Sequence, residues 1–314
     1  DNMTERNVTM LKKRLTEQFP QLTMEENAEM SRYTSLHLGG PADLLAEPSS
    51  PSEVRGILVS AKELGVPVTL VGRGSNLLVL DGGIRGLTLR IAQSMRGITQ
   101  QGTELTVLAG TSMAALANYA ADHDLTGLSF VSGIPGTVGG GAVMNAGAYG
   151  GEMKQVVIGV SGFDLDGQAV SFDDEALHMS YRHTALQEQP VVVCEVRLRL
   201  THGSGEAIRA EMADFNRRRA EKQPLQTPSA GSTFKRPANG FAAALIEECG
   251  LKGYNIGGAR VSEKHAGFLV SVGGTAADFT ALMAHVQRVV EEQKGVRLEP
   301  EVRILGEVAD IRNC

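Results

Sequence analysis

Cysteine is scarce in this chain of 314 residues. The three copies, Cys194, Cys249 and Cys314, are odd in number, far apart and in no Cys-x-x-Cys pattern. A disulfide framework needs an even set of cysteines, and a zinc site needs ligands at short spacing. The seven histidines show no ligand spacing either. We therefore predict reduced thiols, a cytoplasmic location and no metal site.

The chain also lacks an excess of positive charge. It holds 30 basic and 36 acidic residues, for a net charge of −6. A protein of this sign is a poor ligand for nucleic acid or for an anionic membrane surface, so we expect neither partner. Residues 201–270 differ, with ten basic and seven acidic residues. That local excess favours a small anionic substrate, although an ordinary fluctuation of composition explains it equally well.

Charged residues are absent from residues 125–151. A stretch of this length could span a bilayer. However, it contains nine glycines and Pro135, and would make a poor helix with unsatisfied backbone groups in lipid. We predict a buried, irregular loop system and no membrane insertion. The basic residues at 12–14 are followed by a mixed polar segment, so we also expect no secretory leader.

Hydrophobic periodicity predicts an α+β protein with two N-terminal units and one C-terminal unit. Asp166-Gly167 predicts a hairpin turn, and Ser50-Pro51 predicts the start of a helix. The predicted helices cover residues 11–19, 51–64, 112–123, 206–222, 241–249 and 276–294. The predicted strands cover residues 42–46, 67–71, 77–80, 87–91, 105–108, 156–164, 168–172, 191–200, 268–272 and 302–305.

A first glycine-rich motif, Gly72-Arg-Gly-Ser-Asn-Leu-Leu-Val, follows a predicted strand. A Rossmann fingerprint would need glycine at position 77, which is Leu77, and a helix where a second strand is predicted. A turn of this kind can still present consecutive backbone N–H groups to a phosphate. A tight turn without a ligand is the alternative.

The uncharged stretch carries a second glycine-rich system at residues 132–140 and 144–150. A buried segment of this kind must satisfy its own amides. A large cofactor with phosphates and a flat ring provides both acceptors and packing surface, and small residues let the backbone come close. The two glycine-rich systems therefore suit a long dinucleotide lying between two units.

Taken together, three motifs resemble the FAD-binding signature of the UDP-N-acetylenolpyruvoylglucosamine reductase family, in its compact class. They are Gly72-x-Gly-Ser-Asn-Leu-Leu-Val, Gly133-Ile-Pro-Gly-Thr-Val-Gly-Gly and Asn145-Ala-Gly-Ala-Tyr-Gly. The resemblance extends from Tyr33 to Ile304. It implies a two-subdomain FAD-binding fold of the vanillyl-alcohol-oxidase kind and non-covalent FAD. The implied FAD contacts are Gly72, Arg73, Gly74, Ser75, Asn76, Leu77, Gly133, Ile134, Pro135, Gly136, Thr137, Gly139, Asn145, Ala146, Gly147 and Tyr149.

The same resemblance implies a division of the chain into four parts. Residues 1–35 would form an N-terminal helical segment. Residues 36–201 would bind FAD, in subdomains of about 36–95 and 96–201. Residues 202–308 would bind the substrate, and residues 309–314 would be a tail.

Three further motifs carry the implied chemistry: Tyr181-Arg182, the segment Ser-Ala-Gly-Ser-Thr-Phe-Lys at 229–235, and Pro-Glu-Val-Arg at 300–303. By resemblance, Ser232 is the proton donor, and Arg182 and Glu301 complete the catalytic set. Tyr181 and Lys235 would bind the substrate.

The implied reaction is the NADPH-dependent reduction of UDP-N-acetylglucosamine enolpyruvate to UDP-N-acetylmuramate for peptidoglycan synthesis. The implied partners are this substrate and NADPH, and we expect the protein to be a monomer. Thr184 stands where the family favours serine, and Arg236 stands where asparagine is common.

Without the resemblance, these residues have ordinary explanations. An arginine such as Arg182 is usually a surface ion-pair partner, and Ser232 and Glu301 would be called solvated. The basic segment 216–222 is more often a solvated helix face than a diphosphate site. Two other functions remain open: a flavin-linked oxidase, although no His or Cys for covalent attachment lies between residues 72 and 81, and a non-catalytic nucleotide-sugar binder.

Overall fold

The computed structural model describes residues 2–309. The chain forms two compact units, each with its own hydrophobic core. The larger unit consists of Asp1–Glu26, Leu44–Arg73 and Gly86–Arg219, and the smaller unit consists of Asn27–Asp43, Gly74–Arg85 and Ala220–Cys314. Each unit is therefore assembled from three separated stretches of chain. The four-part division by residue number stays a prediction, and its tail beyond residue 309 lies outside the described residues.

The helices of the larger unit begin where the sequence supplies an N-cap. Helix α2 (Pro51–Glu63) begins after Ser50, whose Oγ accepts from the Glu53 N–H at 3.2 Å. Helix α3 (Met113–Asp122) begins after Ser112, whose Oγ accepts from the Ala115 N–H at 3.0 Å. Both predicted helices are confirmed. Helix α1 (Asn2–Gln18) packs against α2 and begins well before the predicted start at residue 11.

A five-stranded sheet of order β12-β11-β13-β7-β6 forms the centre of the larger unit. The hairpin of β11 (Val157–Asp164) and β12 (Ala169–Asp173) closes at the predicted turn, where Gly167 has φ +81°. In β13 (Val191–Arg199), Val196 and Leu198 are buried while the alternate arginines are exposed, as predicted. The remaining strands are β7 (Glu104–Leu108) and the edge strand β6 (Ile98–Gln101), which was not predicted because it is largely polar.

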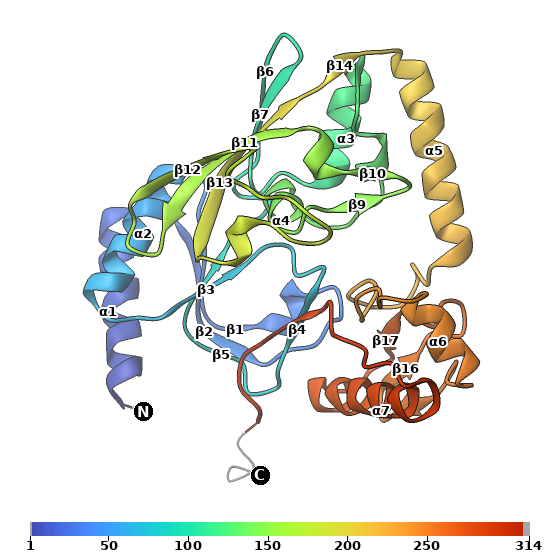
Figure 1. Ribbon diagram of the computed structural model, residues 1–314. Coiled ribbons are helices and arrows are strands. Elements are labelled where there is room, and N and C mark those ends of the chain that lie inside the picture. The colour runs from blue at the N-terminus through green and yellow to red at the C-terminus, as the bar shows by residue number, and fades with distance from the viewer. Residues whose placement is uncertain (1, 310–314) are drawn as a thin grey trace. The chain divides into compact units, whose positions relative to one another are not determined.

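The uncharged stretch contains a helix, so the prediction of an entirely irregular loop system is wrong there. Helix α4 (Val138–Val143) follows Thr137, whose Oγ1 accepts from the Gly140 N–H at 3.1 Å. Its glycines permit close packing on β13, β7 and α3 (Figure 1). A Cβ at Gly139 would lie only 2.8 Å from the Ala109 Cβ. Among residues 2–309, no helix is long and apolar enough to cross a membrane.

A second sheet has the order β1-β2-β5-β3. Its strands are β1 (Thr23–Glu29), β2 (Pro41–Glu47), β5 (Ile84–Arg90) and β3 (Val68–Val71), and β3 pairs with β5 in parallel. The polar strand β1 was not predicted, because Ala28 is its only buried residue. Two short pairs join β8 (Leu125–Thr126) to β14 (Thr201–His202) and β9 (Gly147–Ala148) to β10 (Gly151–Glu152).

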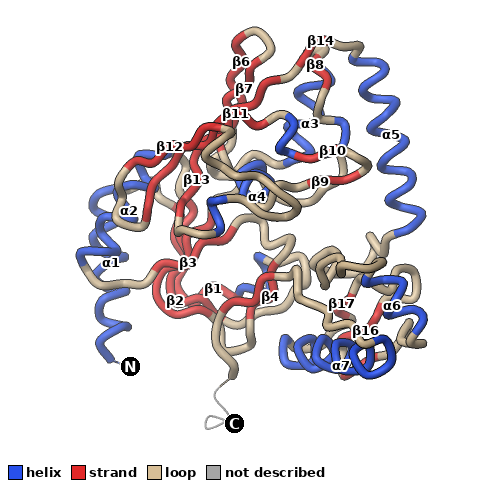
Figure 2. The backbone as a smooth tube through the Cα atoms, viewed as in Figure 1, coloured by secondary structure: helices blue, strands red, loops and turns tan. Residues whose placement is uncertain are grey.

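Short 3-10 helices complete these connections. They are η1 (Met30–Tyr33), η2 (Ser129–Val131), η3 (Met153–Gln155) and η4 (Ala185–Gln187). The long helix α5 (Gly205–Lys222) then leads from the last strand of the larger unit into the smaller one along the chain. Between α5 and α6 the chain is loop (Figure 2), as the prolines at 224 and 237 indicated.

The smaller unit is built on α7 (Ala276–Lys294), which packs against α6 (Ala242–Glu248) and a three-stranded sheet (Figure 1). The sheet has the order β15-β16-β17, with β15 (Asn255–Ile256), β16 (Ala259–Val261) and β17 (Leu269–Ser271). Asp81 caps α7 from far along the chain, since its carboxylate accepts from the N–H groups of Ala276 and Ala277, both at 2.9 Å. Strand β18 (Arg303–Leu305) pairs in parallel with β4 (Leu77–Val79).

Candidate active site

The first glycine-rich loop connects β3 to β4 and leaves a run of backbone donors open. Within residues 2–309, no protein acceptor is found for the N–H groups of Arg73, Gly74, Ser75 and Asn76. Gly74 has φ +72°, a conformation that favours glycine. Consecutive open amides in a tight turn form an anion-binding concavity. The loop is therefore suited to a phosphate.

The second glycine-rich loop also leaves donors open, just before α4. The N–H groups of Val138 and Gly139 are bonded to the carbonyls of Thr111 and Ala109, at 2.8 and 2.9 Å. In the described part of the chain, the N–H groups of Gly133, Gly136 and Thr137 have no such acceptor. The start of the helix is thus held by bonds within the protein, while the amides of the preceding loop are open to a ligand.

The start of the first glycine-rich loop contacts the second inside the larger unit, where a Cβ built at Gly72 would lie 3.4 Å from Thr137 Oγ1. Two motifs some sixty residues apart in the sequence are therefore adjacent at Gly72 and Thr137, as binding a single large ligand with more than one phosphate requires. The residues present fit a dinucleotide cofactor.

Helix α5 adds a buried cation to the second loop. Arg219 is only 7% exposed, and its Nη1 donates to the Ser132 carbonyl at 2.8 Å. One turn earlier, Asn216 Nδ2 donates to Ser132 Oγ at 3.0 Å. Burial lowers the pKa of Arg219, although Tyr149 opposes this shift. The arginine nevertheless stays charged, because its ordinary pKa lies so far above neutrality.

This burial corrects the expectation of a solvated basic face at Arg219, whereas Arg217 and Lys222 are exposed as expected. The signal was present in the sequence, because the buried residues of α5 follow helical spacing. They are Ile208, Met212, Phe215 and Arg219. Arg219 therefore continues the apolar stripe, and helical spacing places it on the buried face of α5.

Aromatic and amide side chains shape the rest of the second glycine-rich system. Tyr149 stacks on Phe215 with ring centroids 4.6 Å apart, and the Arg218 guanidinium lies 4.8 Å from the Tyr149 centroid. The buried Asn145 side chain donates to Ser180 O at 2.9 Å and accepts from the Lys154 N–H at 2.8 Å. These protein partners commit the Asn145 side chain to holding the loop.

The other sequence-predicted cofactor residues fall into two groups. Ser75, Ile134 and Gly147 are half-buried and Pro135 is exposed, so they are reachable from solvent. Leu77 and Gly139 are buried in β4 and α4, and the Ala146 N–H is bonded to the Gly141 carbonyl. The second group contributes packing and loop geometry.

Arg182 belongs to the larger unit and contacts the second glycine-rich system. Its Nη2 donates to the Gly147 carbonyl at 3.1 Å, and its backbone has φ +52°. The half-buried guanidinium lies 5.5 Å from the ring centroid of Tyr181, which is 58% exposed. A positive φ in a residue other than glycine is uncommon and costs free energy, and such residues cluster at functional sites.

Ser232 and Glu301 are brought together in the smaller unit around Thr233. The buried Thr233 donates its N–H to the Gly267 carbonyl at 2.9 Å, and its carbonyl accepts from the Glu301 N–H at 2.8 Å. Ser232 is exposed, and Glu301 is half-buried. Lys235 is also exposed, and its N–H donates to the Glu299 carbonyl at 2.8 Å. The bond between Thr233 and Glu301 therefore holds the backbones of Ser232 and Glu301 close together.

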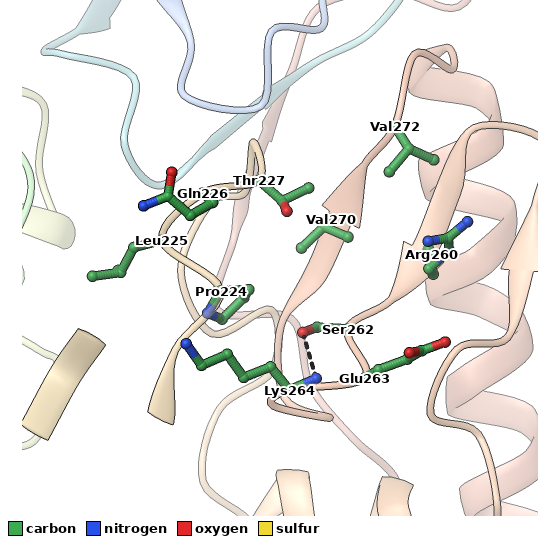
Figure 3. A pocket seen from close by; sticks show the side chains of 10 residues that line it. All are labelled: Pro224, Leu225, Gln226, Thr227, Arg260, Ser262, Glu263, Lys264, Val270 and Val272. Atoms are coloured by element: carbon green, nitrogen blue, oxygen red, sulfur yellow. Dashed lines mark hydrogen bonds between the residues drawn. The ribbon is translucent and has the colours of Figure 1, made fainter. Parts of the chain in front are cut away.

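A cavity of about 270 Å³ adjoins this loop within the smaller unit (Figure 3). One wall is formed by residues 224–227, and the other by residues of β16, β17 and the segment between them. Val270 of the cavity wall pairs with Ser229 of the Ser232 loop. Sequence reasoning missed its cations, Arg260 and Lys264, although they contribute to the basic excess at 201–270.

Neither cysteine of the described residues takes part in these sites. Cys194 and Cys249 are free thiols, and burial raises the pKa of Cys194 to about 12. A thiol with so high a pKa is inert as a nucleophile. Among residues 2–309, no three His, Cys, Asp or Glu side chains gather as a metal site would need.

Comparison with known proteins defines the class first. Residues 42–173 match the family model of an FAD-binding domain, so the chain is a flavoprotein. Residues 223–305 match the model described as the C-terminal domain of UDP-N-acetylenolpyruvoylglucosamine reductase.

The relatives define the family. The chain is 46% identical over 289 residues to the UDP-N-acetylenolpyruvoylglucosamine reductase of Limosilactobacillus fermentum, covering 92% of this chain and 96% of that protein. It is 46% identical over 282 residues to that of Caldanaerobacter subterraneus, covering 90% and 93%. The crystal structure of the Thermus caldophilus enzyme superposes with a TM-score of 0.78 at 34% identity, covering 91% of this chain and all of that one. The chain belongs to this reductase family, which confirms the predicted family and fold class.

Proposed function

We propose that this protein is the FAD-dependent reductase that converts UDP-N-acetylglucosamine enolpyruvate to UDP-N-acetylmuramate in peptidoglycan precursor synthesis, with NADPH as the source of hydride. The observation that carries the proposal is the meeting of the two glycine-rich loops, whose open amides lie in a region that matches FAD-binding domains. A protein that used these loops only as tight turns would have no need to leave seven backbone donors open.

The residues of the two loops fit FAD. The open N–H groups of residues 73–76 would hold one phosphate, and those of Gly133, Gly136 and Thr137 would hold the other. The Arg219 cation, fixed against Ser132, adds favourable charge beside the second loop. When bound, FAD supplies hydride transfer between the nicotinamide and the carbon–carbon double bond.

The chain's own residues supply the charges and the proton. Addition of hydride to one alkene carbon leaves negative charge delocalised into the carboxylate of the enolpyruvyl group. Arg182 stabilises that charge. Such stabilisation is strongest when the donor is already held in place, and the bond from Arg182 to the Gly147 carbonyl holds its guanidinium. Glu301, if kept neutral by desolvation, donates to the developing enolate.

The last carbon then needs a proton, which Ser232 donates. A serine hydroxyl has a pKa far above neutrality, so it transfers its proton only when it is held against the carbanion. The backbone bonds of Thr233, on the next residue, supply that rigidity.

The substrate contains a diphosphate with two negative charges, and the cavity in the smaller unit offers a place for it. Arg260 and Lys264 supply positive charge, and Leu225, Val270 and Val272 supply apolar surface (Figure 3). Exposed Lys235 and Tyr181 are further substrate-binding residues in this proposal. The enzyme acts in the cytoplasm as a monomer.

The visible spectrum of the purified protein tests the proposal. Protein supplied with FAD should be yellow, should be bleached by NADPH, and should recover its colour when the enolpyruvyl substrate is added under anaerobic conditions. Denaturation should release the flavin, which a covalent oxidase would retain. A well-folded protein that stays colourless would overturn the proposal and leave the nucleotide-sugar binder.

Ser232→Ala tests the proton donor. Bleaching by NADPH should stay within about twofold of wild type, while recovery of colour with substrate should slow by at least about a thousandfold. Ser94→Ala, which removes an exposed hydroxyl of the larger unit, is the matched control and should change neither rate. Equal loss in both half-reactions would contradict the role of Ser232.

A further inference from the structure

Ser35 links the first glycine-rich loop to the loop of the proton donor, all within the smaller unit. Its N–H donates to the Gly74 carbonyl at 3.0 Å. Its Oγ lies 2.6 Å from the Ser229 carbonyl and 3.2 Å from the Gly74 carbonyl. A hydroxyl has one proton, which is best placed for the shorter contact. Ser35 therefore ties Gly74 with its backbone and Ser229 with its side chain.

Asn76 makes a second link, from the same glycine-rich loop to the segment of Glu301. Its Nδ2 donates to the Glu301 carbonyl at 3.2 Å, and its carbonyl accepts from the Arg303 N–H at 3.0 Å. The Glu301 N–H is in turn bonded to the Thr233 carbonyl at 2.8 Å. Asn76 thus holds the backbone of Glu301 from one side, while Thr233 holds it from the other.

The two links enclose Ser232. One fixes the chain three residues before it, at Ser229, and the other reaches Thr233, the residue after it, through Glu301. Between these anchors, Gly231 has φ +73° and no neighbour within 4 Å of a built Cβ. Side-chain packing at Gly231 therefore does not fix the path of the chain into Ser232, and the Gly231 N–H itself bonds to Ser229 Oγ, at 3.4 Å, on the anchored side. The anchors at Ser229 and Thr233 thus limit where Ser232 can lie.

The peptide plane carries the effect to the cofactor side. The carbonyl of Gly74 and the N–H of Ser75 belong to one planar unit and point in opposite directions. When Ser35 fixes the Gly74 carbonyl, it also fixes the direction of the open Ser75 N–H, which the proposed function assigns to a phosphate. One residue thus orients an amide for the cofactor and anchors the loop of the proton donor.

We propose that Ser35 and Asn76 are positioning residues that hold Ser232 and Glu301 in register with the cofactor-binding loop. Neither residue supplies a proton or a charge to the reaction. This inference rests on the proposed function, because it needs a flavin at the loop and a proton from Ser232. It predicts that the Ser35 hydroxyl serves the protonation step and not the uptake of hydride from NADPH.

Ser35→Ala tests the inference, because it removes the bond to Ser229 and keeps the backbone bond to Gly74. FAD affinity and the rate of bleaching by NADPH should stay within about threefold of wild type. Recovery of colour with substrate should slow by about ten- to a hundredfold, as expected for a misplaced catalytic group. The solvent deuterium isotope effect on that recovery should increase, since proton transfer becomes limiting.

Thr34→Ala is the matched control. Thr34 is the preceding residue, and its buried Oγ1 bonds to the Leu38 carbonyl at 2.9 Å, inside its own segment. This variant should lose thermal stability at least as much as Ser35→Ala, yet keep the wild-type isotope effect. A merely structural role for Ser35 would make the two variants behave alike, and that result would overturn the inference.

Asn76→Asp tests the second link, because it keeps the shape of the side chain but faces the Glu301 carbonyl with an acceptor. It should slow recovery by at least about tenfold and should also increase the isotope effect. Recovery at the wild-type rate would contradict the role of Asn76.

Amide exchange separates failure of the inference from failure of the proposed function. With or without FAD, Ser35→Ala should exchange faster than wild type at residues 229–234, and unchanged exchange there would overturn the inference. A wild-type protein that bound no FAD would overturn the proposed function, while this exchange measurement would still decide whether Ser35 holds the loop.

Discussion

Two glycines of the smaller unit share almost the same backbone conformation and differ in everything around them. Gly74, in the first glycine-rich loop, has φ +72°, and Gly231, beside Ser232, the proposed proton donor, has φ +73°. A Cβ at Gly74 would lie 2.1 Å from the Tyr33 carbonyl oxygen, whereas a Cβ at Gly231 would meet nothing within 4 Å. The first glycine permits a close backbone approach, and the second only sets the direction of a turn.

The difference teaches how the two loops work. Residues 73–76 keep their N–H groups open, so this loop must be fixed through its carbonyls and by tight packing. In the loop of Ser232, the N–H groups of Thr233 and Lys235 are bonded to other segments of the protein, so this loop offers a side chain instead. In the proposed function, the first loop would bind a phosphate through amides held by tight packing, and the second would position the Ser232 hydroxyl between two anchored neighbours.

The largest expected effect comes from Gly74→Ala. The added methyl group collides with backbone, which cannot rotate away as a side chain can, and the positive φ adds strain. We expect a loss of roughly 3 kcal/mol or more in the free energy of unfolding and at least about a hundredfold weaker FAD binding. Denaturant unfolding measures the free energy of unfolding, and a flavin fluorescence titration measures the FAD affinity.

Gly231→Ala is the control for that variant. It has the same φ and open space, so only the conformational cost of about 1–2 kcal/mol remains, and FAD affinity should not change. Equal losses of affinity in the two variants would show that φ alone, and not the close approach at Gly74, decides cofactor binding.

A smaller effect is expected from Asp81→Ala, which removes the acceptor of two N–H groups at the start of α7 without touching either loop. The N–H groups of Ala276 and Ala277 would lose their acceptor, for a cost of about 1–2 kcal/mol. FAD affinity should stay at the wild-type value, which would show that stability loss alone does not weaken cofactor binding. Asp81→Asn keeps one acceptor and should cost less. A hundredfold loss of FAD affinity in Asp81→Ala would show that any loss of stability weakens FAD binding, and that the effect of Gly74→Ala is not specific to its loop.

The smallest expected effect is a pH dependence at the support of the Ser232 loop. His265 Nδ1 accepts from the Gly267 N–H at 3.1 Å, and the Gly267 carbonyl holds Thr233. Burial lowers the pKa of His265, while Lys252 lowers it and Glu247 raises it by smaller amounts. As the pH falls through about 6.5, the unfolded chain takes up the proton first, so stability decreases.

The melting temperature should therefore fall by roughly 1–3 °C more in wild type than in His265→Asn between pH 7.5 and 5.5. Asparagine keeps an acceptor for Gly267 but does not titrate. Identical pH profiles for the two proteins would show that His265 contributes nothing to the pH response.

Sequence reasoning succeeded wherever the determinant was local. Ser50 and Ser112 cap their helices as the pattern indicated, and the Asp166-Gly167 turn closes its hairpin. The glycines of α4 misled it, because glycine disfavours a helix in isolation, and here the close packing against Ala109 favours it. The reach of Asp81 to α7 crosses almost two hundred residues and leaves no local signal.

The candidate site shows the same limit. The motifs predict Ser232, Glu301 and Arg182 as catalytic, which stays a prediction, and the structure adds that the Glu301 N–H bonds to the carbonyl of Thr233, the residue after Ser232. Arg219 could have been found from its place on the apolar stripe of α5. Ser35 could not, because its role depends on Gly74 and Ser229, which only the tertiary fold brings within reach of one side chain.

The parallel pairing of β4 with β18 has a consequence for biosynthesis. Leu77 is matched with Arg303, so the partner of β4 emerges last. At synthesis rates of about 5–20 residues per second, Leu77 waits roughly ten to forty-five seconds on the ribosome before its neighbour exists. Leu78, which is buried in the folded protein, therefore lacks its β18 neighbour during that wait.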